Sequence, residues 1–285
     1  MVSDGPRVID VLHLGRPNVI ACFQQGGVLV DPGPEVCSPA LFEALGDEAP
    51  EAVLLTHIHL DHAGAAGAVV RRWPHVKVVV HERGARHVVD PSKLVASATR
   101  LYGDDMARLW GEILPVPQEN LIVVGDAERI DDFGGPWRVA YTPGHASHHV
   151  AYLHEPTGTL FAGDVAGVRI AGGPVLPPTP PPDIDIEAWH ASVDLLRGWD
   201  AARMAITHFG LFADVGAQFD ELLATLDLFS AAARRTDAAG YAEFVRGVVR
   251  RGSDAGGLEG AMFQAAPPDT LWHGLDRYWR TRAQD

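Results

Sequence analysis

The chain has 285 residues, of which 47% are hydrophobic and 21% charged, and its mean hydropathy is close to zero. This composition excludes a disordered or collagen-like chain and fits one large domain, or a domain with an appendage. Acidic residues outnumber basic ones by 37 to 23, and the net charge of −14 argues against a nucleic-acid partner. No apolar run is long enough to span a membrane and the N-terminus lacks a signal-peptide pattern, so we expect a cytoplasmic protein without a membrane partner.

Short apolar runs bounded by Gly, Pro and Asp predict β-strands through the first two thirds of the chain. The predicted strands are residues 19–23, 27–30, 52–55, 77–81, 121–124, 137–141, 149–153, 159–162 and 204–207. Helical spacing lies between some of them, at residues 39–45, 63–73 and 186–199. Residues 83–117 also have helical spacing and are interpreted as a helical insertion. This order predicts a mixed α/β fold.

After Gly210 the pattern becomes purely helical. Apolar residues fall on one helix face at Phe219, Leu222, Leu223, Leu226 and Phe229, and on another at Leu271, Trp272, Leu275, Tyr278 and Trp279. We predict a catalytic domain over residues 1–212 and a helical C-terminal extension over residues 213–285 that packs on it. The extension is expected to shape the cleft or an oligomer contact, without supplying catalytic groups.

Four candidate metal ligands fall within six positions, directly after an apolar strand and directly before a helix. They are His57, His59, Asp61 and His62. On an extended turn, His57 and His59 project to the same side, whereas Asp61 and His62 can turn toward a second point. The spacing therefore suits two adjacent metal positions better than one.

Three further candidates each follow a predicted strand: His145, Asp164 and His208. Functional groups of α/β folds collect at one end of the strands, so we expect these residues to complete the cluster. Five histidines and two carboxylates suit two divalent ions, Zn²⁺ above all, although iron and manganese accept the same ligands. Such ions would activate a water as the nucleophile. No GxSxG elbow is present that would supply a serine instead.

The uninterrupted HxHxDH motif resembles that of the metallo-β-lactamase superfamily, and the resemblance covers roughly residues 11–211. It implies an αββα sandwich of two mixed β-sheets with outer helices. By position, it implies that His57, His59 and His145 bind the first metal, that Asp61, His62 and His208 bind the second, and that Asp164 bridges them. Asp61 and Asp164 are the predicted catalytic residues, and Asp31, in a Val-Asp-Pro-Gly turn, would support the site from behind.

The resemblance implies a binuclear metal-dependent hydrolase whose metal-bridging hydroxide attacks an ester, thioester, lactone or related acyl or phosphoryl bond of a small substrate. The chain resembles glyoxalase II in its THxHxDH and GH motifs, but the residues after Asp164 differ from that enzyme. The alternative is a persulfide-dioxygenase-like oxidoreductase with one iron held by His57, His145 and Asp164. The full second set of ligands opposes this alternative. It also opposes a binding protein without enzymatic activity, which would have lost ligands.

Several residues near the motifs receive structural roles. We expect His148 to be a bystander, His149 to be an internal support, Asp183 and Asp185 to initiate a helix, and Cys22 and Cys37 to be packed thiols. The insertion and the proline-rich loop at residues 172–183 would overhang the metals. Apolar candidates there are Leu94, Leu101, Tyr102, Met106, Leu109, Trp110, Val175 and Leu176. Such a cleft favours an uncharged or moderately apolar small-molecule substrate. The sequence is also compatible with a homo-oligomer.

Overall fold

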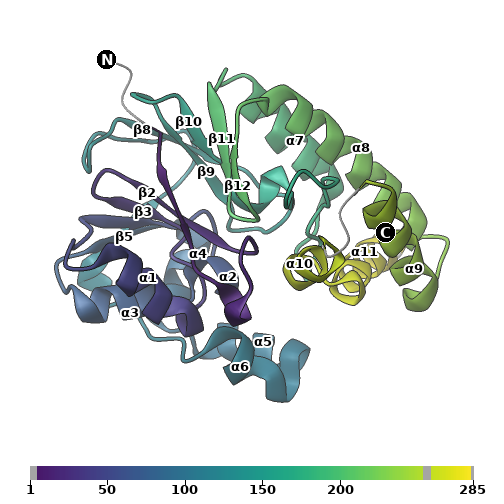
Figure 1. Cartoon of the computed structure of the whole chain (residues 1–285), viewed down its shortest axis with the longest axis horizontal. Coiled ribbons are helices and arrows are strands. Elements are labelled where there is room, and N and C mark those ends of the chain that lie inside the picture. The colour runs from purple at the N-terminus through teal and green to yellow at the C-terminus, as the bar shows by residue number, and fades with distance from the viewer. Residues whose placement is uncertain (1–4, 253–257, 284–285) are drawn as a thin grey trace.

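The computed structural model describes residues 5–252 and 258–283, which form two six-stranded β-sheets packed face to face with helices outside (Figure 1). The first sheet contains, in order, β1 (Arg7–Asp10), β2 (Ala21–Gln25), β3 (Val28–Val30), β4 (Ala52–Leu54), β5 (Lys77–His81) and β6 (Leu121–Val124). The second contains β12 (Gly210–Phe212), β11 (Arg203–Ile206), β10 (Thr159–Phe161), β9 (Val150–His154), β8 (Trp137–Tyr141) and β7 (Arg129–Ile130). Both sheets mix parallel and antiparallel pairs.

The helices lie outside the sheets and at one end of them. They are α1 (Ser38–Leu45), α2 (Leu60–Ala63), α3 (Ala66–Arg72), α4 (Glu82–Val89), α5 (Ser92–Tyr102), α6 (Met106–Trp110), α7 (Ile186–Arg197), α8 (Val215–Ala233), α9 (Ala238–Arg251), α10 (Leu258–Ala265) and α11 (Pro268–Arg282). In Figure 1, α1 and α3 cover the first sheet and α7 and α8 flank the second. Among the described residues, no helix is both long and apolar enough to cross a membrane.

Alternation along the strands explains the sandwich. Leu54 of β4 points between the sheets, into a core shared with Trp137 and Phe161 of the second sheet. Its neighbour Val53 points the other way, into the core beneath α1 and α3 that also contains Leu41. Each central strand therefore buries both faces, as strands covered by helices do. The αββα sandwich predicted from the motif is confirmed.

The C-terminal helices share one core with the second sheet. Phe219 and Leu222 of α8 are buried in the same cluster as Trp189 of α7, and Leu271 and Leu275 of α11 belong to it as well. Exposing side chains of this size would forfeit about 1.5–3 kcal/mol each, so these helices need the sandwich as a surface. The domain boundary predicted at residue 212 falls between β12 and α8.

The structure corrects the expected elements at several points. Residues 210–212 form strand β12 rather than helix, and β1 and β7 were not predicted. The helix predicted at 63–73 is α3, which begins only at Ala66, and a separate short helix, α2, ends at Ala63. The insertion is helical only to Trp110, because Gly111 takes a positive φ of 75°, and residues 111–117 have no regular secondary structure.

Candidate metal centre

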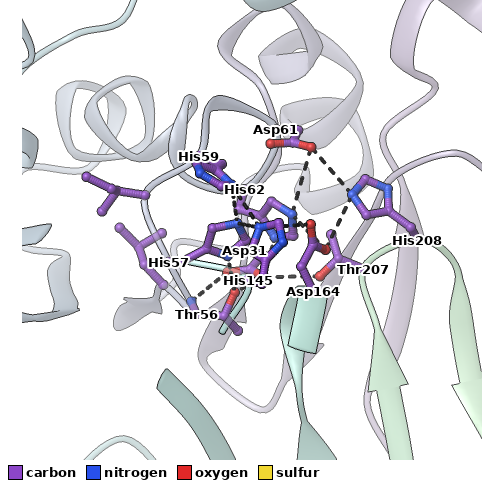
Figure 2. Close-up of polar contacts among 12 residues, drawn as sticks. Asp31, Thr56, His57, His59, Asp61, His62, His145, Asp164, Thr207 and His208 are labelled. Carbon is purple, nitrogen blue, oxygen red and sulfur yellow. Dashed lines mark hydrogen bonds and ion pairs between the residues drawn. The ribbon is translucent and has the colours of Figure 1, made fainter. Parts of the chain in front are cut away.

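The seven predicted ligands meet at one edge of the sandwich (Figure 2). His57 and His59 lie in the turn after β4, and Asp61 and His62 lie in the short helix α2 that follows. The other three come from the second sheet: His145 between β8 and β9, Asp164 after β10, and His208 between β11 and β12. The fold thus brings together residues more than a hundred positions apart, because each of them lies in a segment that follows a strand at the same edge.

Three imidazoles converge in the first half-site, which we define as His57, His59 and His145. His57 Nε2 lies 3.0 Å from His59 Nδ1, and His145 Nε2 lies 2.9 Å from the same atom and 3.3 Å from His57 Nε2. His145 Nδ1 donates to the carbonyl of Pro178, 2.8 Å away, so its Nε2 carries the free lone pair. Three ring nitrogens that face one point are suited to hold a cation.

The second half-site consists of Asp61, His62 and His208. Asp61 Oδ2 lies 3.4 Å from His208 Nε2 and 3.9 Å from His62 Nε2. His208 Nδ1 donates to the carbonyl of Val19 at 2.8 Å, which again leaves Nε2 as the ligand atom. The half-site therefore offers one carboxylate oxygen and two imidazole lone pairs.

Asp164 lies between the half-sites and turns one carboxylate oxygen toward each. Its Oδ2 is 3.4 Å from His145 Nε2 in the first half-site. Its Oδ1 is 3.2 Å from His62 Nε2 and 3.6 Å from His208 Nε2 in the second. Gly163, with φ 49°, places it there, since a Cβ on Gly163 would lie within 2.8 Å of Thr56 and His149 side-chain atoms.

Asp31 holds the site from behind, as the motif implied. The fully buried carboxylate accepts four hydrogen bonds: from Thr56 N, Thr56 Oγ1, His62 Nδ1 and Thr207 Oγ1, over 2.7–3.0 Å. Because Thr56 Oγ1 donates to Asp31, it accepts from His57 Nδ1 at 3.1 Å. Asp31 thereby keeps a proton on Nδ1 of His62 and, through Thr56, of His57, so that Nε2 is the atom that can bind a metal in both rings.

The chemistry of the donor set fits two metal ions. Among the described residues, His62 Nε2, His208 Nε2 and Asp164 Oδ1 are buried without a hydrogen-bond partner. Buried polar atoms rarely stay unpaired, and these three are aimed at one another, so a ligand is the expected partner. The His/Asp clusters are thus consistent with a binuclear site.

The histidines of the two half-sites differ in the direction of their pKa shifts. Burial lowers the pKa of His57 well below its ordinary value and that of His59 to about 4, so both rings are neutral at pH 7. Burial also opposes a charge on His62, but Asp164, Asp31 and Asp61 together raise its pKa well above the ordinary value. A cation that binds at the second half-site must therefore displace a proton from His62.

A cavity of about 1050 Å³ opens over the metal centre. Its lining contains predicted apolar residues of the insertion, Leu94, Leu101, Tyr102, Leu109 and Trp110. Met106, Val175 and Leu176 were also expected there, but the described lining lacks them, and the latter two are buried in the core of the second sheet. The proline-rich loop lines the cavity instead with Pro178 and residues 180–183, and the C-terminal helices contribute residues from Phe263 to Arg277.

The remaining predicted residues take mostly the expected places. His149 is buried and its Nδ1 shares a 2.8 Å hydrogen bond with Thr142 Oγ1, as an internal support should. His148 lines the cavity, and its Nδ1 accepts from Ile58 N at 3.4 Å. Asp185 caps α7 by accepting from Ala188 N at 3.0 Å. Asp183 does not initiate the helix, because its carboxylate accepts from the Ser147 side chain instead.

Some residues that shape the site were missed by the sequence analysis. Thr56 and Thr207 bind Asp31, and the repeated Thr-His pairs at 56–57 and 207–208 were the signal that could have found them. The carbonyls of Val19 and Pro178 orient His208 and His145, but a backbone carbonyl leaves no signal in a sequence.

Comparison with known proteins agrees with this geometry. The sequence pattern of the metallo-β-lactamase superfamily matches residues 19–208, more than half of the chain. The chain therefore belongs to the metallo-β-lactamase superfamily and contains the His/Asp cluster of its metal-dependent hydrolases.

Individual relatives are more distant. The metallo-β-lactamase fold-containing protein ST1585 of Sulfurisphaera tokodaii is 33% identical over 144 residues, which cover 50% of this chain and 53% of that protein. A hydroxyacylglutathione hydrolase of Legionella pneumophila is 28% identical over 140 residues, 48% of this chain and 42% of that enzyme. The match thus spans about half the length of these curated relatives. The crystal structure of ST1585, from Sulfolobus tokodaii, superposes with a TM-score of 0.73 at 25% identity over 95% of this chain and 98% of that one.

Proposed function

We propose that this protein is a binuclear metal-dependent hydrolase of ester, thioester or lactone bonds in a small substrate. The observation that carries the proposal is the position of Asp164, whose two carboxylate oxygens face different half-sites. The ligand groups of Asp61, His62 and His208 lie within 4.8 Å of one another. A protein that bound a single metal at the first half-site would leave these three residues without a function.

When bound there, two divalent ions, Zn²⁺ above all, would supply the nucleophile by lowering the pKa of a shared water toward about 7, and would polarise the carbonyl. The chain's own part is to hold the ligands. Asp31 and the carbonyls of Val19 and Pro178 keep the rings of His62, His208 and His145 in the tautomer that leaves Nε2 free. The helices and the proline-rich loop that line the cavity surround the space where a substrate would reach the metal centre.

A thioester comes first among the bonds to test. Hydroxyacylglutathione hydrolases are among the relatives that match about half of this chain. The cavity is also large enough for a substrate with a long arm, since pockets for drug-sized ligands have about 300–1,000 Å³.

The decisive experiment measures metal content and hydrolysis together. Protein stripped with a chelator is titrated with Zn²⁺, and we expect two equivalents to bind and thioester hydrolysis to appear as the second binds. His208→Ala should bind about one equivalent and lose hydrolysis. His190→Ala is the matched control, because His190 binds Asp227 on the surface away from the cavity and should retain two equivalents.

One result would overturn the proposal in favour of the persulfide-dioxygenase-like alternative. Protein purified without added metal would then contain one iron per chain and bind no second ion on addition of zinc. The assembled second half-site argues against this outcome.

A further inference from the structure

One wall of the cavity is rich in positive charge. Helices α4 and α5 turn Arg83, Arg86, Lys93 and Arg100 toward it, and we call these four residues the basic wall. Their spacing explains the common direction, since residues three apart on α4 and seven apart on α5 lie on one helix face. The sequence pattern alone indicated only apolar cavity residues in this insertion, and therefore an uncharged substrate.

The basic wall has neighbouring carboxylates, Glu82 beside Arg83 and Asp90 near Lys93, but its side chains are not paired with them. Apart from the metal-centre residues, the acidic side chains that line the cavity are Glu82 and Asp183, and Asp183 binds Ser147. Elsewhere arginines pair with carboxylates, as Arg197 does with Asp220. Among residues 5–252 and 258–283, no carboxylate forms an ion pair with a basic-wall side chain. In a chain with a net charge of −14, four unpaired cations on one cavity wall are a local reversal of charge.

Contacts with neighbouring side chains orient two cations of the basic wall, and the pKa of a neighbouring histidine reflects its positive charge. The guanidinium of Arg83 lies 5.4 Å from the centre of the Tyr141 ring, and Arg86 Nε donates to His87 Nε2 at 3.1 Å. Both arginines keep their terminal N–H groups free for a ligand, as far as the described residues show. Burial lowers the pKa of His87, and the positive charges of Arg86 and Lys93 lower it further, although the carboxylate of Asp90 opposes them.

We propose that the basic wall binds an anionic group, a carboxylate or a phosphate, on the arm of the substrate that leads away from the scissile bond. The proposal rests on the proposed hydrolase function, because the metal centre fixes the other end of the substrate. Arginine presents forked N–H donors that match both anions, and lysine adds a point charge. Leu94 and Leu101, which line the same cavity from α5, would contact the apolar part of the arm.

The test uses three thioesters that differ only in their terminal group: S-butanoylpantetheine, its 4′-phosphate and its 4′-hemisuccinate. With the zinc-loaded protein, we expect at least one anionic thioester to have a KM lower than that of the neutral one by on the order of tenfold. Rising salt should reduce this ratio, because exposed charges are screened over about 10 Å at 0.1 M. The anion with the larger ratio identifies the kind of group.

Variants then locate the effect. Arg86→Gln combined with Lys93→Gln should bring the KM ratio close to one. Arg108→Gln is the matched control in the same insertion, because Arg108 pairs with Asp105 and does not line the cavity, so the ratio should stay at its original value. The proposal is wrong if wild-type protein shows no preference for either anion, or if the double variant keeps the preference.

Binding separates this inference from the hydrolase proposal. Thioether analogues of the three compounds cannot be hydrolysed, and their affinities are measured by calorimetry on the zinc-loaded protein. If the anionic thioethers bind more tightly and the double variant loses the difference, the basic wall is an anion site even if no thioester is hydrolysed. Equal affinities for the neutral and anionic thioethers would contradict it.

Discussion

The floor of the cavity and its rim differ in how firmly their side chains are held. On the floor, the metal-centre residues are braced from behind, as when Asp31 accepts four hydrogen bonds. On the rim, formed by α4 to α6, the proline-rich loop and α10 to α11, α5 contains no buried residue at all. Elements with few buried contacts open most readily. The sandwich therefore fixes the chemistry, whereas α5 can change selectivity at little cost to the fold.

The largest effect is expected on the floor, from Asp164→Ala. The change removes both oxygens that connect the half-sites, so hydrolysis should fall by more than about a hundredfold, since loss of a partner one shell further out already costs about 10–100-fold. Steady-state rates and elemental analysis at saturating zinc measure the effect. His148→Ala is the comparison, because His148 lines the cavity without belonging to either half-site. Equal losses at full metal occupancy would give His148 a catalytic role.

A second change tests whether the metal centre needs the hydrogen bonds that Asp31 accepts. Asp31→Asn keeps the size of the side chain and tolerates the φ of 51° at this position, but replaces one acceptor oxygen with an amide. We expect zinc affinity to fall about 10–100-fold because the tautomer of His62 is no longer fixed. Competition titration against a zinc chelator measures this. An unchanged affinity would show that the ligands need no support from behind.

The strands of the sandwich differ in how well the sequence predicted them. Strand β5 was predicted at Lys77–His81 as observed, because its run of valines is apolar on both faces. The missed strands β1, β7 and β12 are short, and each contains exposed or half-exposed residues, so no apolar run marks them. Periodicity reports burial, and it cannot report a strand that is held mainly by backbone pairing at or near the edge of a sheet.

The seven residues that meet at the candidate metal centre could be predicted, because metal binding requires specific side chains close to strand ends. The basic wall could not be found in the same way. Its four cations are ordinary surface residues until α4 and α5 fold over the cavity, which depends on tertiary packing. Asp183 shows the same limit: its position before α7 suited a helix start, but the structure places Ser147 beside it.

A moderate effect is expected where the rim meets the floor, at Gly274. This glycine of α11 packs on the carbonyl of Thr179, and an added Cβ would overlap it. Gly274→Ala should therefore lower the free energy of unfolding by about 1–3 kcal/mol, and should weaken zinc binding by shifting the adjacent Pro178 carbonyl that orients His145. Urea unfolding and zinc titration measure the two effects.

The control for Gly274 is a glycine with room beside it. A Cβ on Gly216, near the start of α8, would have its nearest contact 3.7 Å away, so Gly216→Ala should be neutral or stabilise the protein by up to about 1 kcal/mol. If both variants unfold at the same urea concentration, α11 is not packed tightly on the proline-rich loop.

The smallest effect is expected from a change that should lower stability without changing metal binding. Asp185→Ala removes the side-chain cap of α7, and should lower the free energy of unfolding by about 1 kcal/mol. The backbone contact that joins α7 to the loop before His145 is unaffected, because Asp185 N donates to the carbonyl of Gly144 whatever the side chain. Zinc stoichiometry should therefore stay at two, and Asp185→Asn, which keeps an acceptor for Ala188 N, should unfold close to wild type. Loss of a zinc ion in Asp185→Ala would show that the cap positions His145, and that the floor is less independent of its surroundings than the comparison with the rim implies.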